Sequence, residues 1–189
     1  MNKFSKRVLA LAAIALIFPA AILAAETATP VESNIPKMLE VGTKAPNFTR
    51  TTASGQKLSL KSFRGKKTVL LYFYPKDETP NCTKEACGFR DLFAELKGVN
   101  AAVIGVSGDS DESHKSFAEH YSLQFPLISD SDNSLLDLYH VPFYKGSLHK
   151  RVTFVIDKHG IIRNVISDTN DGDIQVKEAT AALQVINKE

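Results

Sequence analysis

Hydrophobic residues change their spacing halfway through the stretch from Leu70 to Arg90, around which the rest of the chain is organised. Residues 68–74, TVLLYFY, form a short apolar run rich in β-branched and aromatic side chains, which predicts a strand buried on both faces. Pro75 ends this run, and apolar residues between 86 and 96 then recur three or four positions apart. The second half of the stretch is therefore predicted to be a helix.

The remaining pattern places further strands and helices around this stretch. Residues 48–52 and 56–60 flank the turn signal Ala53-Ser-Gly55, which predicts a β-hairpin. Beyond the helix in the second half of that stretch, the pattern predicts strands at 101–106, 126–128, 153–156 and 161–166. It also predicts helices at 111–121, 134–140 and 173–187. This order, β-α-β-α-β-α-β-β-α after an N-terminal hairpin, predicts an α/β fold whose central sheet is covered by helices.

Residues 1–25 follow a different pattern. Lys3, Lys6 and Arg7 precede an unbroken apolar run of 18 residues, 8–25, which ends in small residues and predicts a secretory signal peptide. An uncleaved anchor is the alternative, because the run approaches the length that spans a bilayer. We therefore expect an exported, periplasmic protein, or one anchored to the inner membrane and facing the periplasm.

The charge balance changes when this segment is set aside. The full chain carries 23 Lys and Arg against 21 Asp and Glu, a net charge of +2, which becomes −1 without residues 1–25. No run of basic residues remains, so nucleic acid is not an expected partner. Residues 26–40 are polar, contain two prolines and show no period, which indicates a linker, and residues 41–189 suit a single domain.

Candidate chemistry lies in the two cysteines of the chain, Cys82 and Cys87. Thr79 or Asn81 can cap the predicted helix, which places Cys82 in its first turn. A free thiol has a pKa of about 8.5 and is mostly protonated at neutral pH. The unpaired N–H groups and the positive end of the helix dipole favour the thiolate there, so Cys82 is the candidate nucleophile.

The spacing of the two cysteines restricts how they can interact. In an ideal helix, residues five apart have Cα atoms about 8.6 Å apart, whereas a disulfide needs less than about 7 Å. If Cys82 and Cys87 bridge, the first turn and a half of the helix must unwind. A structural disulfide is the commoner use of two cysteines in an exported protein, but here it would break the predicted helix and close only a short loop.

The pattern Pro75-x-x-x-Thr79-x-x-Cys82 matches the active-site pattern of the peroxiredoxins. The longer string YFYPKDETPNCTKEACGFRD resembles their bacterioferritin-comigratory, or Q-type, subgroup. The similarity extends from about Val41 to the C-terminus, through GTKAPNF, GVSGDS, FPLISD and RVTFVIDKHGIIR. This resemblance implies a thioredoxin-like fold with a mixed central sheet, flanking helices and an added N-terminal hairpin.

The resemblance also implies roles for individual residues. Cys82 is then the peroxidatic cysteine and Cys87 the resolving one, Thr79 and Arg151 hold the thiolate and the peroxide, and Pro75 shapes the pocket. The implied enzyme reduces hydrogen peroxide and organic hydroperoxides through a Cys82 sulfenic acid and a Cys82–Cys87 disulfide. A thioredoxin-like dithiol protein resets it, no cofactor is implied, and we expect a monomer.

Some of these residues have simpler explanations. Arg151 could be a solvated charge at a strand end, and Glu85 could either favour the helix N-terminus or position a reacting group. No metal site is expected from the histidines, because none has a compact ligand spacing to another: His114, His120, His140, His149 and His159.

Two other function classes share the expected fold. Thioredoxin-like copper chaperones of the cell envelope separate their cysteines by three residues and use a downstream histidine, whereas four residues separate the cysteines here. Disulfide oxidoreductases of the thioredoxin type need two intervening residues and a cis-proline where this chain has Val152. Both classes fit the spacing less well than a peroxidase does.

Overall fold

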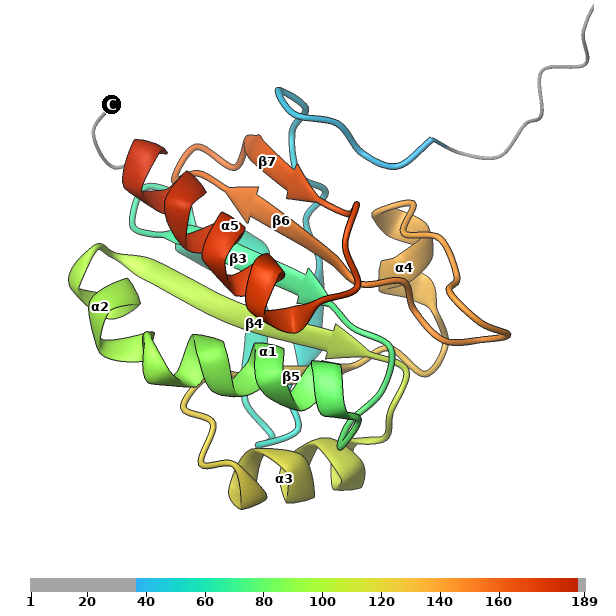
Figure 1. Ribbon diagram of the computed structural model, residues 1–189. Coiled ribbons are helices and arrows are strands. Elements are labelled where there is room, and N and C mark those ends of the chain that lie inside the picture. Colours follow the sequence, from blue (N-terminus) through green and yellow to red (C-terminus); the bar gives the residue numbers. More distant parts are fainter. Residues whose placement is uncertain (1–36, 187–189) are drawn as a thin grey trace, which may run out of the picture. The chain divides into compact units, whose positions relative to one another are not determined.

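A five-stranded sheet runs through the centre of the computed structural model, which describes residues 37–186 (Figure 1). The strand order is β5-β4-β3-β6-β7, with the bounds Leu127–Ser129 (β5), Ala101–Ser107 (β4), Thr68–Phe73 (β3), Val152–Ile156 (β6) and Ile162–Ile166 (β7). β4 is parallel to β3 and β5, whereas β6 is antiparallel to β3 and β7. This mixed sheet flanked by helices confirms the predicted fold class.

Both faces of the sheet are covered, which explains why β3 is apolar throughout and buried along its whole length. Successive side chains of a strand point to opposite faces. Leu71 and Phe73 enter one hydrophobic cluster, to which η1 (Leu60–Phe63) and α4 (Ser134–Leu138) contribute. Leu70 and Tyr72 enter a second cluster with residues of α1 (Pro80–Asp91), α3 (Asp111–His120) and α5 (Gly172–Ile186). Figure 1 shows α1 and α5 packed side by side over this second face.

The predicted N-terminal hairpin is confirmed. Its strands, β1 (Thr49–Thr51) and β2 (Lys57–Ser59), are antiparallel and form a two-stranded sheet of their own among residues 37–186. Gly55 has a φ of +83°, a backbone conformation that other residues adopt at a cost, which explains the glycine in this turn. The N–H of Ala53 donates a hydrogen bond of 3.0 Å to the carbonyl of Leu127, and this bond attaches the hairpin to β5.

The cysteine-containing helix departs from the prediction at its C-terminal end. The apolar spacing up to residue 96 predicted one helix, but α1 ends at Asp91 and a separate helix, α2 (Phe93–Gly98), follows. Leu92 lies between them with φ −89° and ψ 1°, outside the α-helical region. The change of direction places Leu96 in the second hydrophobic cluster. The other predicted elements match the observed ones to within two residues at each end.

The predicted signal peptide, residues 1–25, lies outside the described residues, as does most of the predicted linker. At the end of that linker, Met38 and Leu39 pack against the first hydrophobic cluster. No helix within residues 37–186 is long and apolar enough to cross a membrane. Export therefore stays a prediction from residues 1–25.

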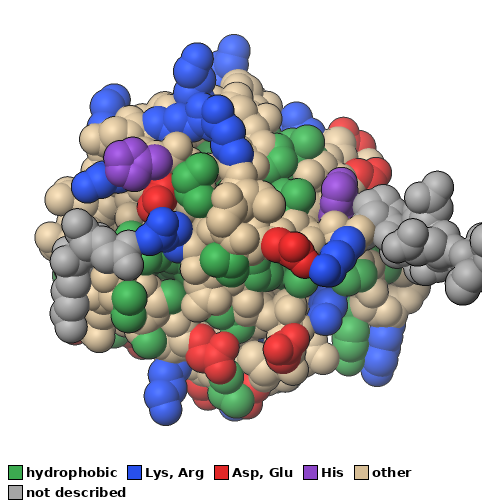
Figure 2. All heavy atoms as spheres, turned by 90° about the horizontal axis from the view of Figure 1, so that it is seen from above, with side chains coloured by type: hydrophobic (Ala, Val, Ile, Leu, Met, Phe, Trp, Pro, Cys, Tyr) green, Lys and Arg blue, Asp and Glu red, His purple; other side chains and the backbone are tan. Residues whose placement is uncertain are grey.

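On the face shown in Figure 2, acidic and basic side chains occur together, with hydrophobic side chains in small patches between them.

Candidate active site

Cys82 lies in the first turn of α1, as the sequence predicted. Pro80 is the first residue of the helix, and Thr79 precedes it with an extended backbone of φ −79° and ψ 147°. Proline suits this position because the first helical N–H has no partner within the helix and the ring presets φ. Thr83 makes an early helical hydrogen bond, of 2.8 Å, to the carbonyl of Thr79. The thiol of Cys82 is buried, with 1% of the residue exposed.

A buried arginine contacts the sulfur. Nη2 of Arg151 donates to Sγ of Cys82 at 3.1 Å, and only 2% of Arg151 is exposed. The sheet creates this contact across 69 residues of sequence. Val152 of β6 pairs with Phe73, the last residue of β3. Arg151, which directly precedes Val152, therefore lies at the end of the sheet from which the chain continues to α1. Because Arg151 is buried against the sulfur, the alternative of a solvated strand-end charge is wrong.

Two further groups hold the guanidinium in place. Nη1 of Arg151 donates a hydrogen bond to Oε2 of Glu85, and Nε donates to the carbonyl of Asn170 at 3.1 Å. Glu85 lies one turn after Cys82 and is fully buried. Burial raises the pKa of Glu85 to about 7 against the opposing attraction of Arg151. The three contacts point Nη2 toward the sulfur and leave the guanidinium little freedom to rotate.

Thr79 and Pro75 both lie near the start of α1, but among the described residues the Thr79 hydroxyl makes no hydrogen bond to Cys82. The hydroxyl of Thr79 donates to the carbonyl of Lys76 at 2.9 Å and does not cap the helix. Thr79 is nevertheless the N-cap residue by its backbone, and Asn81, the alternative cap, is the second residue of the helix. Pro75 follows the end of β3 and is half-buried. The role of Thr79 in holding the thiolate and the peroxide and that of Pro75 in shaping the pocket stay predictions.

Cys87 lies on the same unbroken helix, and both thiols are free. It is half-buried, and burial raises the pKa of its thiol. By helix geometry, the Cα atoms of Cys82 and Cys87 are about 8.6 Å apart, beyond bridging range. The structure thus represents the reduced state with its helix formed.

Tyr72 and Asn170 are neighbours of the site that sequence reasoning missed. Tyr72 is fully buried, and its hydroxyl has no hydrogen-bond partner among the described residues, as is also true of Oε1 of Glu85. Burial, followed by the charges of Glu85 and Cys82, raises the pKa of Tyr72 well above its usual value. The tyrosine therefore stays neutral beside Cys82. Its place in an apolar strand carried no signal of this proximity.

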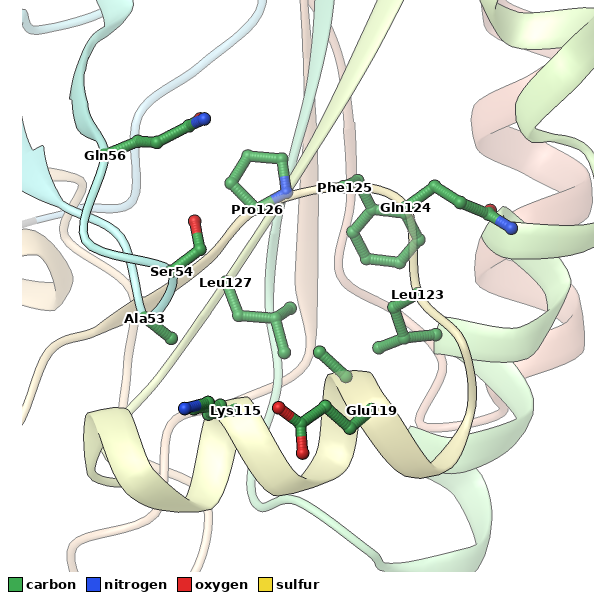
Figure 3. A pocket seen from close by; sticks show the side chains of 11 residues that line it. Ala53, Ser54, Gln56, Lys115, Glu119, Leu123, Gln124, Phe125, Pro126 and Leu127 are labelled. Carbon is green, nitrogen blue, oxygen red and sulfur yellow. The ribbon is translucent and has the colours of Figure 1, made fainter.

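Other parts of the described chain offer less to this chemistry. Within residues 37–186, no group of three or more His, Cys, Asp or Glu side chains could hold a metal ion. A cavity of about 490 Å³ lies between α3, the hairpin turn and the segment leading into β5, but none of the predicted site residues lines it (Figure 3). Lys115 and Glu119 project from α3 along one wall, with Phe125 and Leu127 on the opposite side. Cys82 thus lies outside this cavity.

Comparison with known proteins places this site in a family. The model of the AhpC/TSA family matches residues 41–165, which is more than half of the chain. The chain belongs to the AhpC/TSA family, the peroxiredoxins. Peroxiredoxins are thiol peroxidases, so this peroxiredoxin is an oxidoreductase, and the family resemblance noted in the sequence is confirmed.

Several relatives of this peroxiredoxin carry the names of the bacterioferritin-comigratory, or Q-type, subgroup. It is 49% identical over 133 residues to a protein of Coxiella burnetii named peroxiredoxin bcp, covering 67% of this chain and 87% of that one. It is 43% identical over 144 residues to the chloroplastic peroxiredoxin Q of Sedum lineare, covering 76% and 77%. Among solved structures, peroxidoxin BcpB of Mycobacterium tuberculosis matches with a TM-score of 0.73 and 34% identity, covering 78% of this chain and 98% of that one.

Proposed function

We propose that this peroxiredoxin reduces hydrogen peroxide and organic hydroperoxides, with Cys82 as the attacking thiolate. The hydrogen bond of 3.1 Å from the guanidinium of Arg151 to Sγ of Cys82 carries this proposal. An isolated thiol is mostly protonated at neutral pH, whereas one that combines a fixed cation with the start of a helix favours the thiolate. The same planar guanidinium has further N–H groups, which suits it to hold both the sulfur and a peroxide oxygen.

In the first step, the Cys82 thiolate attacks the terminal oxygen of the peroxide. A sulfur–oxygen bond forms while the oxygen–oxygen bond breaks, so the sulfur is oxidised to a sulfenic acid and the peroxide is reduced. The departing hydroxide or alkoxide takes up a proton and leaves as water or an alcohol. The positive charge of Arg151 stabilises the negative charge that moves from sulfur to the departing oxygen.

In the second step, the thiol of Cys87 condenses with the sulfenic acid. A disulfide forms and water is released, which requires the first turns of α1 to open because the helix keeps the two cysteines too far apart. A dithiol protein of the thioredoxin type then reduces the disulfide by thiol exchange. These steps involve only side chains of the enzyme and its reductant, and no cofactor takes part.

The cellular setting that we propose comes from residues 1–25. Their basic start and apolar run support export to the periplasm, with anchoring to the inner membrane as the alternative if the segment is not cleaved. We propose that the domain works as a monomer. Extraction and N-terminal sequencing of the expressed full chain separate cleavage from anchoring.

Single-turnover kinetics test the roles of the two cysteines. Cys82→Ser should abolish peroxide consumption, since the nucleophile is lost. Cys87→Ser should consume one equivalent at a rate close to that of the parent protein and then stop as a sulfenic or over-oxidised acid. Equal loss of the first turnover in both variants would overturn the assignment.

A further inference from the structure

The loop between β3 and α1 contains a buried carboxylate, Asp77, which is 4% exposed. Its Oδ1 accepts a hydrogen bond of 2.7 Å from the hydroxyl of Tyr74, and its Oδ2 accepts one of 2.8 Å from the hydroxyl of Ser113. Nδ1 of His114 lies 2.9 Å from Oδ2 and donates to it when it carries the hydrogen. Three donors therefore converge on one carboxylate.

These donors connect the loop to a different part of the fold. Tyr74 follows the end of β3, whereas Ser113 and His114 belong to the N-terminal half of α3, where the helix dipole favours a negative charge. The N–H of Asp77 also donates to Oδ2 of Asp109 at 2.9 Å, in the segment between β4 and α3. Backbone and side chain of the same residue thus both attach the loop to α3 and its approach.

The charge of Asp77 is supported by this environment. Burial alone would raise its pKa, but the hydrogen bonds and charge of His114, with the hydroxyls of Tyr74 and Ser113, hold the pKa below its usual value. Tyr74 and His114 are both buried to within 1% of full burial, with ring centroids 6.1 Å apart. An ionised carboxylate loses much when such partners are removed, because water cannot replace them.

The residue after Asp77 shows why this attachment bears on catalysis. Glu78 has a φ of +59°, a left-handed conformation that is uncommon for a residue other than glycine. Such a conformation persists where the surrounding contacts determine it. Thr79 and Pro80 follow immediately and begin α1, so the direction of the first helical turn depends on this turn of the loop.

We propose that Asp77 is a positioning residue for the peroxidase reaction: its carboxylate fixes loop 75–79 against α3, and with the loop the turn that carries Cys82. The proposal rests on the proposed function of Cys82. Because the attachment precedes Thr79, it also stays closed when the helix beyond it opens for disulfide formation. Asp77 thereby sets where the opening of α1 begins and lets the same first turn re-form after reduction.

Asp77→Asn tests the proposal, with Glu112→Gln as the matched control. The amide keeps the size of the carboxylate but replaces one acceptor oxygen with an NH₂ group that faces donors. Glu112 is an exposed acid in the first turn of α3, and it interacts with Ser110 and with its own backbone. We expect Asp77→Asn to slow the first turnover with hydrogen peroxide about tenfold or more, since a small displacement of reacting groups has effects of this size. Glu112→Gln should match the parent protein.

Two further measurements separate positioning from a general loss of stability. In folded Asp77→Asn, the pH profile for alkylation of Cys82 should move to higher pH, because a displaced first turn stabilises the thiolate less. The amide of Asp77, which donates to Asp109, should exchange faster in both redox forms of this variant, whereas in the parent disulfide form it should stay protected. A lower melting temperature with an unchanged alkylation profile and turnover would overturn the proposal.

Two controls keep the test decisive. If Asp77→Asn does not fold, Ser113→Ala removes one donor from the half-exposed edge of the cluster and should slow turnover about threefold. A turnover rate equal to that of Glu112→Gln would then overturn the proposal. Failure of the proposed function can be told apart from failure of the Asp77 proposal, because in the first case the parent protein itself would consume no peroxide through Cys82.

Discussion

Replacing Arg151 with lysine separates the charge of this side chain from its geometry. In the folded enzyme the guanidinium contacts three groups at once: Sγ of Cys82, Oε2 of Glu85 and the carbonyl of Asn170. An ammonium keeps the positive charge and can pair with Glu85, but it cannot reproduce the planar arrangement of donors. We therefore expect Arg151→Lys to fold and to lose the hydrogen bond to the sulfur.

The size of the effect follows from that one contact. A hydrogen bond to a charged group contributes about 1.5–3 kcal/mol, and about 1.4 kcal/mol corresponds to a tenfold change in rate. Arg151→Lys should thus lower the rate constant for oxidation of Cys82 about ten- to hundredfold. Weaker stabilisation of the thiolate should also move the pH profile for alkylation of Cys82 to higher pH.

Single-turnover loss of hydrogen peroxide, measured at several pH values, tests this expectation. Arg163→Lys is the matched control, since Arg163 lies on β7 of the same sheet and 38% of its side chain is exposed. The control should retain the parent rate and profile. If the rate constant of Arg151→Lys for oxidation by hydrogen peroxide stays within twofold of those of the parent protein and Arg163→Lys, the guanidinium does not act through the sulfur. The role of Arg151 must then be reassigned.

Three further predictions concern the helix, the buried acid and metal binding. Hydrogen exchange should show amides 83–89 protected in the reduced protein and unprotected in the disulfide form, because Cys82 and Cys87 cannot bridge within a formed helix; equal protection in both forms would refute the opening. The pKa of Glu85 is raised from 4.5 to about 7, so this group stabilises the fold at low pH, and the contribution is lost as pH rises from about 4.5 to about 7. In urea unfolding of the reduced protein, the free energy of unfolding should therefore fall by roughly 2–3 kcal/mol less between about pH 5 and 7 in Glu85→Gln than in the parent protein. Parallel curves of the free energy of unfolding against pH for the two proteins would contradict this prediction. Cu(I) should bind no tighter than it does to an ordinary dithiol, and one copper retained per protein against a strong chelator would favour a copper chaperone instead.

The order of elements and the place of Cys82 follow from local sequence. The apolar run of β3 and the helical spacing beyond it predict a buried strand that leads into a helix, and the structure confirms both. Periodicity alone did not predict the break at Leu92, because that break depends on how α2 packs beneath the sheet. Hydrophobic periodicity indicates which face of a helix is apolar, but it does not indicate where one helix ends and the next begins in a new direction.

The partners of Cys82 depend on contacts that local sequence does not reveal. Arg151 was assigned from a family resemblance, since the pairing of β6 with β3 that brings it to the sulfur spans most of the domain. Glu85 and Asp77 resemble ordinary acids near a helix start, and only tertiary packing shows that both are buried. The direction of the Thr79 hydroxyl, toward Lys76, is likewise a detail of loop conformation.

Intact-mass analysis after one equivalent of hydrogen peroxide tests the central claim most directly. The parent protein should lose two hydrogens and all reactivity toward a thiol-blocking reagent, which identifies a Cys82–Cys87 disulfide. Cys87→Ser should instead gain one oxygen atom, and Cys82→Ser should keep its mass and its free thiol. Oxidation of Cys82→Ser at the parent rate would contradict the account, because the nucleophile would then be a residue other than Cys82.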